Sequence, residues 1–456
     1  MHETVRKANK IYLAGDYAKA GAMAETYLLE HPDDAQALTI LAACLKQGNR
    51  TAVAYTLAKR AVELRPDRSE TWGTQGHMAQ NLWRMDEAFS CYRKALQRAQ
   101  NANQRGLYLN NIASTHLDLG QFEKAETFVR QSLEQDPNDP NARHNLGLCL
   151  LAKRDWEEAW KWYSASLGSS YRSEFRYGKE PVWDGKPGGL VVVYGEQGLG
   201  DEICAASVVP EIQRDQTSAG GRLILDCDKR LEGLFRRSFP GVTVHGTRWE
   251  KQLAWPEEDR GITASISAFE VLKHYRRKPG DFKACAFLTP CPDRTQMWRA
   301  FFARTGKPAI GIAWTGGTWK NAGSYRKLPL ADWKPIFECI DAHWVSLQYK
   351  DASEEIKGSP VVQYPWATLG KDYDDTAAMV AALDCVISVP TTVVHLAGAL
   401  GVPTIGMKAP TPCWKFAGDS LAFHPDVKLI QNDGDWRKTA VDTAAIVKQF
   451  LQDSTR

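Results

Sequence analysis

Small apolar residues recur at a fixed period among polar ones in the first third of the chain. One series has successive spacings of 34, 34, 37 and 34 residues and comprises Ala20, Ala54, Ala88, Ala125 and Ala159. A second series lies twelve residues earlier in each repeat and comprises Ala8, Ala42, Gly76, Ala113 and Gly147. Such a period predicts pairs of antiparallel helices that cross where only glycine or alanine fits.

Larger residues and prolines follow the same period. The predicted turns are followed by Tyr17, Phe122 and Trp156, and the repeats end at Pro32, Pro66 and Pro137. The one longer spacing indicates a three-residue insertion near residues 101–105. The pattern resembles the tetratricopeptide repeat, in about five copies over residues 1–167. Stacked repeats of this kind form a curved solenoid whose concave face commonly holds a peptide or protein, and a scaffold or dimerisation role is the alternative.

The texture of the sequence changes after the repeats. Residues 168–189 are rich in glycine, proline, serine and aromatic residues and are expected to form a linker. Short β-rich runs then alternate with helical stretches, which predicts an α/β fold with parallel sheets. The runs form two groups, at 190–194, 222–227 and 242–246, and at 309–314, 344–349, 361–365, 385–389 and 403–407. We therefore expect two Rossmann-like halves, residues 190–292 and 293–456, with a connecting helix at 293–305.

Ligands bind such sheets at the carboxyl ends of the strands, so the loops after the strands are the candidate sites. The first loop comprises Gly195, Glu196, Gln197, Gly198 and Gly200, whose glycines are expected to allow positive φ and close approach of a ligand. Asp201 follows at the start of a helix. Its carboxylate is a candidate general base, and a helix cap is the alternative.

Two loops of the second half carry candidate phosphate-binding groups. The first contains Thr315, Gly316 and Gly317 with the cations Lys320, Arg326 and Lys327, and solvated surface charges are the alternative interpretation. The other contains Thr391 and Thr392, which are expected to cap a helix, and His395 in its first turn. A histidine on a helix is also a common buried core residue.

Composition limits the classes of function. The 456 residues are 43% hydrophobic and carry a net charge of +3, and no apolar run is long enough to span a membrane. The balance of charge argues against a nucleic-acid-coating surface. Ten cysteines without a CxxC pair and a start without an apolar leader predict reduced thiols and a cytoplasmic protein. The oligomeric state is left open.

Several stretches together resemble bacterial tetratricopeptide-repeat proteins whose carboxy-terminal domain is related to the ADP-heptose:lipopolysaccharide heptosyltransferases. They are EPVWDG, GEQGLGD, IGIAWTGG, RKLPLADW, VSLQ, DTAAMVAALD and VPTTVVHLAGALGVP. The resemblance implies a GT-B fold and an inverting glycosyltransferase that needs no metal or other cofactor besides its nucleotide-sugar substrate. The architecture is also similar to that of protein O-GlcNAc transferases, which join such repeats to a GT-B catalytic region, and the repeats themselves favour a protein or peptide partner.

The resemblance also implies roles for individual residues. Asp201 would activate the acceptor, Thr391, Thr392 and His395 would lie near the donor diphosphate, and Arg326 or Lys327 would be the phosphate-binding cation. Gln348 would lie near the nucleoside by strand position, whereas Trp314 could equally belong to the core.

Of two departures from the family pattern, the loss of an aspartate favours an alternative function, and the other indicates a different donor specificity. Pro390 stands where relatives carry an aspartate, and Pro412, Cys413, Trp414 and Lys415 replace an Asp-Trp-Arg-Trp segment. The alternative is an inactive GT-B-like scaffold that acts through its repeats.

A third hypothesis is a dinucleotide oxidoreductase in which Asp226 holds a ribose, but the glycine spacing is GxxGxG rather than GxGxxG. Asp226, Cys227 and Asp228 also spell a DxD motif, in the half that is not expected to hold the donor.

Overall fold

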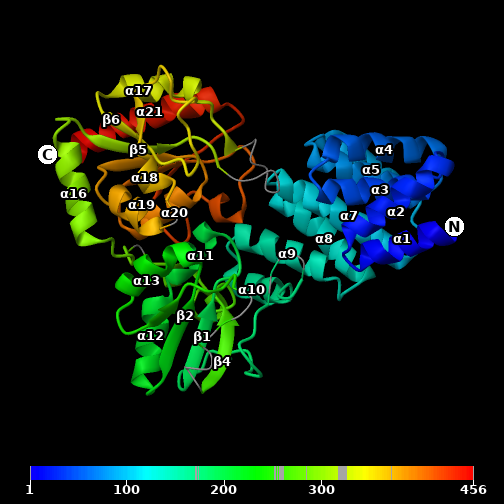
Figure 1. The fold of residues 1–456 in the computed structure, drawn as a ribbon, viewed down its shortest axis with the longest axis horizontal. Helices are drawn as coiled ribbons and strands as arrows, with labels where there is room; N and C mark the ends of the chain where they lie inside the picture. The colour runs from blue at the N-terminus through cyan, green and yellow to red at the C-terminus, as the bar shows by residue number, and fades with distance from the viewer. Residues whose placement is uncertain are drawn as a thin grey trace. The chain divides into compact units, whose positions relative to one another are not determined.

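The computed structural model describes residues 2–169, 172, 174–250, 253, 255, 261–283, 285–316, 326–370 and 372–454. The chain forms two compact units, Met1–Cys149 and Leu150–Arg456. Each unit has its own arrangement of secondary structure (Figure 1).

The first unit is a stack of antiparallel helices, and each of the first eight packs against its neighbour along the chain (Figure 1). Both small-residue series form the crossing points, because every alanine of the two series within this unit is 0% exposed. The predicted helical repeats are therefore confirmed. The helices are α1 (Glu3–Leu13), α2 (Tyr17–Glu30), α3 (Ala35–Gln47), α4 (Thr51–Leu64), α5 (Ser69–Asn81), α6 (Met85–Gln97), α7 (Ala102–Asp118) and α8 (Phe122–Gln135), and α9 (Pro140–Ala152) begins in this unit.

Local signals in the sequence explain where these helices begin and how closely they pack. The Asp34 carboxylate accepts hydrogen bonds from the first backbone N–H groups of α3 and so caps that helix. A Cβ on Gly76 would lie 2.8 Å from the Tyr92 ring, so only glycine lets α6 approach α5 at this point. The insertion near residues 101–105 lengthens α7 to 17 residues, against 13 in α3 and α5.

The second unit contains two parallel sheets with helices packed on them. The first sheet has the order β3-β2-β1-β4, and all its pairings are parallel, with Val191 of β1 opposite Leu223 of β2. Its elements are α10 (Trp156–Ser164), β1 (Leu190–Tyr194), α11 (Leu199–Ala206), α12 (Val209–Ser218), β2 (Arg222–Asp226), η1 (Lys229–Leu231), α13 (Glu232–Ser238), β3 (Thr243–His245), β4 (Ile262–Ser267), α15 (Leu272–Tyr275) and η2 (Pro279–Asp281).

The second sheet has the order β10-β9-β8-β5-β6-β7, again with parallel pairings. Helices α17 and α21 cover one face, and α18, α19 and α20 cover the other (Figure 1). Its elements are α16 (Pro292–Ala303), β5 (Ala309–Ala313), η5 (Leu330–Trp333), α17 (Lys334–Cys339), β6 (His343–Ser346), β7 (Val361–Gln363), α18 (Pro365–Thr368), α19 (Tyr373–Val380), β8 (Cys385–Ser388), α20 (Thr392–Ala399), β9 (Thr404–Met407), η6 (Trp414–Phe416), β10 (Lys428–Ile430) and α21 (Trp436–Ser454).

The predicted α/β character of this unit is confirmed. All eight runs singled out in the sequence overlap a strand, and the predicted connecting helix is α16. Every residue of β1 and β5 is buried, as expected for strands covered on both faces. The sequence prediction missed β4, in which Thr263, Ser265 and Ser267 interrupt the apolar pattern, and the three-residue strand β10.

Candidate functional site

Two helices that follow strands of different sheets begin side by side. Helix α11 follows β1, α20 follows β8, and the two helices pack against each other (Figure 1). A Cβ on Gly200 would lie 3.2 Å from Thr392 Oγ1 and 3.3 Å from His395 Cδ2. Glycine at this position therefore permits close contact between the two helices. The candidate site is assembled around this contact.

Asp201 lies in the first turn of α11 and has two partners. One carboxylate oxygen accepts a hydrogen bond from the Gly198 N–H at 3.0 Å, and the other lies 2.5 Å from Lys415 Nζ. The side chains of Asp201 and Lys415 are 24% and 12% exposed. Burial alone would lower the pKa of Lys415, but the Asp201 carboxylate outweighs this effect, so the pKa is raised and the ammonium group is retained. The pair joins an acid of the first half to a base of the second, 214 residues apart.

Lys415 itself was named in the sequence only as a departure from the family pattern. It lies on η6, and its ammonium group is 4.9 Å from the centre of the Trp414 ring and 5.5 Å from that of Phe269. Because aromatic faces attract cations, these rings help to hold the side chain beside Asp201. No signal close to Asp201 in the sequence could have identified this partner.

The glycines of the first loop do not have the predicted conformation. None of Gly195, Gly198 and Gly200 has positive φ, so that expectation was wrong. As at Gly200, side chains of the protein occupy the space beside Gly195 and Gly198. A Cβ on Gly195 would collide with the Glu202 carboxyl group at 2.5 Å, and one on Gly198 would lie 3.1 Å from Asp201 Oδ2. Packing within the protein therefore requires glycine at position 195 and favours a small residue at position 198.

The polar residues of the same loop are engaged inside the fold. Glu196 forms a buried ion pair with Arg172 at 2.6 Å and accepts a hydrogen bond from Ser267. The Gln197 amide donates to the Tyr163 hydroxyl at 2.6 Å. Both side chains therefore anchor the loop to α10 and the linker.

The predicted cap of α20 is confirmed. Thr391 is the N-cap, and its hydroxyl accepts a hydrogen bond from the Val393 N–H at 3.2 Å. Thr392 is the first residue of the helix and faces Gly200. The N-terminus of the helix carries the partial positive charge of its aligned peptide dipoles, which suits an anion.

His395 is buried one turn into α20. Its Nδ1 lies 3.1 Å from Cys204 Sγ of α11. Burial, reinforced by the positive charges of Lys415 and Arg326, lowers the pKa of His395 to about 3, so the imidazole is neutral at neutral pH. A neutral, buried ring does not supply positive charge to a phosphate.

The loop between β5 and η5 is closed at its base. Thr315 and Lys327 form an isolated antiparallel bridge, and the Gly316 N–H donates to the Arg326 carbonyl at 3.2 Å. Gly316 also lies against Pro390 and Thr391, where a Cβ would be 2.8 Å from the Pro390 carbonyl oxygen. Gly317 and Lys320 lie outside the described residues.

Gln348 completes this patch, because its side-chain amide lies 2.6 Å from Thr315 Oγ1. The structure thus brings the described parts of the second-half site together at the carboxyl ends of β5, β6 and β8. Trp314 belongs to the core, with 0% exposure and its indole N–H donating to Glu355.

The DxD residues form hydrogen bonds and ion pairs within the protein. Asp226 is buried and accepts hydrogen bonds from the Tyr177 hydroxyl at 2.8 Å and from Thr247. Asp228 pairs with Arg230 at 2.9 Å. These contacts leave Asp226 little capacity to hold a ribose or a metal ion.

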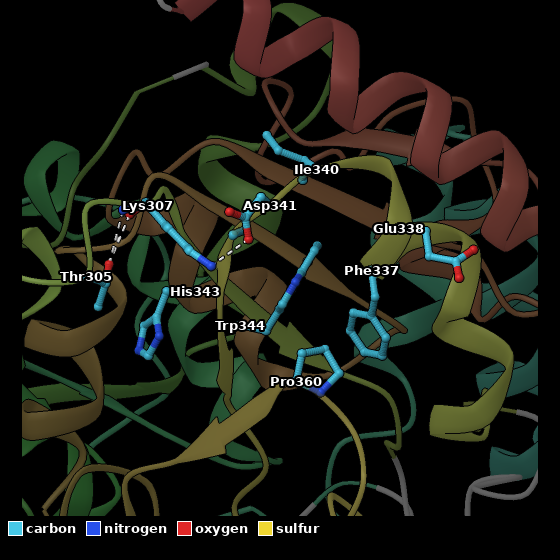
Figure 2. A pocket seen from close by; sticks show the side chains of 10 residues that line it. Thr305, Lys307, Phe337, Glu338, Ile340, Asp341, His343, Trp344 and Pro360 are labelled. Atoms are coloured by element: carbon cyan, nitrogen blue, oxygen red, sulfur yellow. Dashed lines mark hydrogen bonds and ion pairs between the residues drawn. The ribbon is translucent and has the colours of Figure 1, made fainter.

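An open cavity of about 580 Å³ lies at the amino ends of strands β5 and β6, opposite the carboxyl ends that form the candidate site (Figure 2). Lys307 and His343 line it where β5 and β6 begin, and Phe337 and Trp344 provide apolar walls. The Lys307–Asp341 ion pair at 2.6 Å is solvent-exposed, with side chains 46% and 79% exposed. None of the residues predicted to form the site lines this cavity.

Two further structural findings concern membranes and thiols. None of the helices in the described part of the chain combines the length and apolar character needed to cross a bilayer. The ten cysteines all lie among the described residues, and no disulfide joins them, as the sequence predicts.

Comparison with known proteins identifies the helical repeats. Residues 12–69 and 110–172 match one sequence profile of the tetratricopeptide repeat, and residues 67–138 match another. The N-terminal region is a tetratricopeptide-repeat solenoid. These profiles leave most of the α/β region unmatched.

One relative is similar along most of the chain. Protein FlbA of Caulobacter vibrioides is 27% identical over 458 residues, which cover 93% of this chain and 74% of FlbA. Photosystem I assembly protein Ycf3 of Prochlorococcus marinus is 35% identical over 74 residues, which cover 16% of this chain and 43% of Ycf3.

Similar solved structures include two tetratricopeptide-repeat proteins. TTC0263 of Thermus thermophilus has a TM-score of 0.34 and 21% identity, with 37% of this chain and 90% of that chain covered. YrrB, described as having an unusual peptide-binding site, has a TM-score of 0.26 and 22% identity, with 31% and 72% covered.

Proposed function

We propose that residues 150–456 form a GT-B glycosyltransferase that moves a sugar from a nucleotide sugar to a hydroxyl group with inversion. The tetratricopeptide repeats would hold a protein or peptide, as substrate or as anchor. One observation carries this proposal: Asp201 of the first half meets Lys415 and the start of α20 of the second half. The motif resemblance supports the same assignment. A nucleotide-sugar substrate and ten described cysteines without a disulfide suit a cytoplasmic enzyme.

The donor diphosphate would bind at the start of α20. Backbone N–H groups there, together with the hydroxyls of Thr391 and Thr392, donate hydrogen bonds to phosphate oxygens. Lys415 and Arg326 would supply positive charge, and His395 would contribute shape rather than charge. The Gln348–Thr315 contact would border the nucleoside.

The chemistry then depends on an exchange of ionic partners. When Lys415 turns from Asp201 to the diphosphate, the carboxylate is free to accept the proton of the acceptor hydroxyl. The acceptor oxygen bonds to the anomeric carbon from the side opposite the diphosphate, and the bond from that carbon to the leaving oxygen breaks. Lys415 and the helix amides stabilise the negative charge that develops on the leaving group. No step of this sequence uses a metal ion.

Asp201→Asn tests the proposed base. Transfer should fall by about 10²- to 10⁴-fold because the proton acceptor is lost, whereas the fold and donor affinity should persist. Release of nucleoside diphosphate from a panel of nucleotide sugars measures turnover, and thermal shift measures donor binding. Asp184→Asn, an exposed substitution in the linker, is the matched control. Unchanged turnover in Asp201→Asn would remove this residue from the mechanism.

The ion pair also favours a second candidate function, an inactive scaffold. Lys415 already neutralises Asp201, and Pro390 occupies the position of a family aspartate. A scaffold would keep its affinity for a protein partner while releasing no nucleoside diphosphate from any donor. Calorimetric titration with uridine and adenosine diphosphates, together with the release assay, distinguishes the two functions.

A further inference from the structure

Three metal-ligating side chains meet beneath the candidate site. They are Cys204 of α11, His395 of α20, and His424 between η6 and β10. One ligand atom from each lies within 4.8 Å of the other two, and Cys204 Sγ is 3.1 Å from His395 Nδ1. All three residues are buried, with His395 6% and His424 4% exposed.

His424 lacks the hydrogen bonds that a buried imidazole normally makes. Neither ring nitrogen has a hydrogen-bond partner among the described residues. A buried polar group left unpaired costs about 1–3 kcal/mol, and a bound water or ion can satisfy it. The ring is also held in place by packing, because a Cβ on Gly398 would lie 2.7 Å from His424 Cγ. Glycine at this position of α20 lets the imidazole approach His395.

We propose that Cys204, His395 and His424 bind one transition-metal ion of the zinc class. A thiolate and two neutral imidazoles match the ligand preference of Zn²⁺, whereas hard ions such as Mg²⁺ prefer oxygen. Binding releases the thiol proton to solvent, and the sulfur electron pair forms the bond to the metal. Zinc–ligand bonds of about 2.0–2.3 Å place ligand atoms roughly 3–4 Å apart, so a separation near the 4.8 Å limit of this group must shorten when the ion binds.

The surrounding charges are compatible with a cation at this position. Lys415 and Arg326 are the nearby cations, and Asp201 balances the charge of Lys415 in the ion pair described above. The thiolate would offset part of the charge of the metal.

The ion would have a structural role. It would link α11 to α20, and so the first sheet to the second, directly below Asp201 and Thr392. The metal is separate from the proposed transfer chemistry, which uses none. This inference does not rest on the proposed function and would hold equally for a scaffold.

Metal content and cobalt spectroscopy of the full-length chain test the proposal. The purified protein should carry about one zinc per chain, and the chelated protein should take up Co²⁺ with a near-ultraviolet sulfur-to-cobalt charge-transfer band. Cys204→Ser should remove this band, and His424→Gln should weaken Co²⁺ binding at least about tenfold. Cys385→Ser, which alters a buried thiol of β8, should leave both unchanged.

A measurement on the unaltered protein covers the case in which the variants fail to fold. X-ray absorption at the zinc or cobalt edge should show one sulfur and two nitrogen ligands. The proposal is overturned if no metal binds near one equivalent, if the spectrum contains no sulfur ligand, or if folded Cys204→Ser keeps the charge-transfer band.

Discussion

Different interactions stabilise the interior of each of the two units of this chain. In Met1–Cys149 the crossing points are alanines and glycines at a fixed period, and the main contacts join consecutive helices. In Leu150–Arg456 buried charges join distant segments: Arg172 has 0% side-chain exposure and pairs with Glu196 and Glu270. The contacts of the first unit can be predicted from the spacing of residues in the sequence, because each contact recurs in every repeat. The contacts of the second unit cannot be predicted in this way, because each occurs only once.

The largest expected effect comes from breaking the buried charge cluster. Arg172→Met leaves Glu196 and Glu270 without their guanidinium partner and should destabilise the α/β unit by about 3–5 kcal/mol. Native-state hydrogen exchange, resolved by peptide, measures the opening free energy of each unit separately. Peptides of β1 and β4 should lose protection while peptides of α3 to α6 keep theirs.

Arg176→Met provides the matched control for the cluster. Its pair with Glu174 is 37% and 39% exposed, so its loss should cost no more than about 1 kcal/mol. Equal effects of the two substitutions would show that buried charge is not what holds this unit.

A second substitution tests the packing of the repeats. Gly76→Leu forces a side chain into the Tyr92 ring and should destabilise the first unit by about 1–3 kcal/mol. Gly48→Ala is the control, because its Cβ would make only an ordinary contact, 3.5 Å from the Leu45 carbonyl oxygen. In the same measurement, peptides of α5 and α6 should lose protection against hydrogen exchange, and peptides of β1 should keep theirs. A loss in both units would contradict their independence.

A smaller effect concerns the pH dependence of the repeats. Burial, only partly offset by a hydrogen bond from Gln80, raises the pKa of Asp118 to about 6. The unfolded carboxyl group ionises near pH 4, so between about pH 4 and 6 the folded state holds the extra proton. Stability of the first unit should therefore fall as pH rises through this window.

Asp118→Asn should remove this pH dependence. The free energy of unfolding of the variant, relative to that of the wild type, should rise by on the order of 1–3 kcal/mol from pH 4 to pH 7. Urea titrations at the two pH values, followed by hydrogen exchange in α7, measure the gain. Asp86→Asn, at an exposed position of α6, serves as the control. Parallel pH profiles of wild type and Asp118→Asn would refute the assignment.

These differences explain how much the sequence could predict. The alanine series and strand runs were read correctly because helix crossing and strand burial leave local patterns. The partners of Asp201 and Cys204 were missed because they lie 214 and 191 residues away. His424 has no motif around it, and its relation to His395 depends on Gly398 accommodating the ring. The loop glycines were misread because a tight turn and close internal packing both select glycine.

The longer helix α7 has a consequence for whatever binds the repeats. Its 17 residues, against 13 in α3 and α5, add about 6 Å to one inner helix. The lengths of the inner helices of the solenoid are therefore not uniform, and α7 extends beyond α3 and α5. A ligand bound across the extra turn of α7 would be fixed in one register, because a shift by one repeat would remove its contacts with that turn.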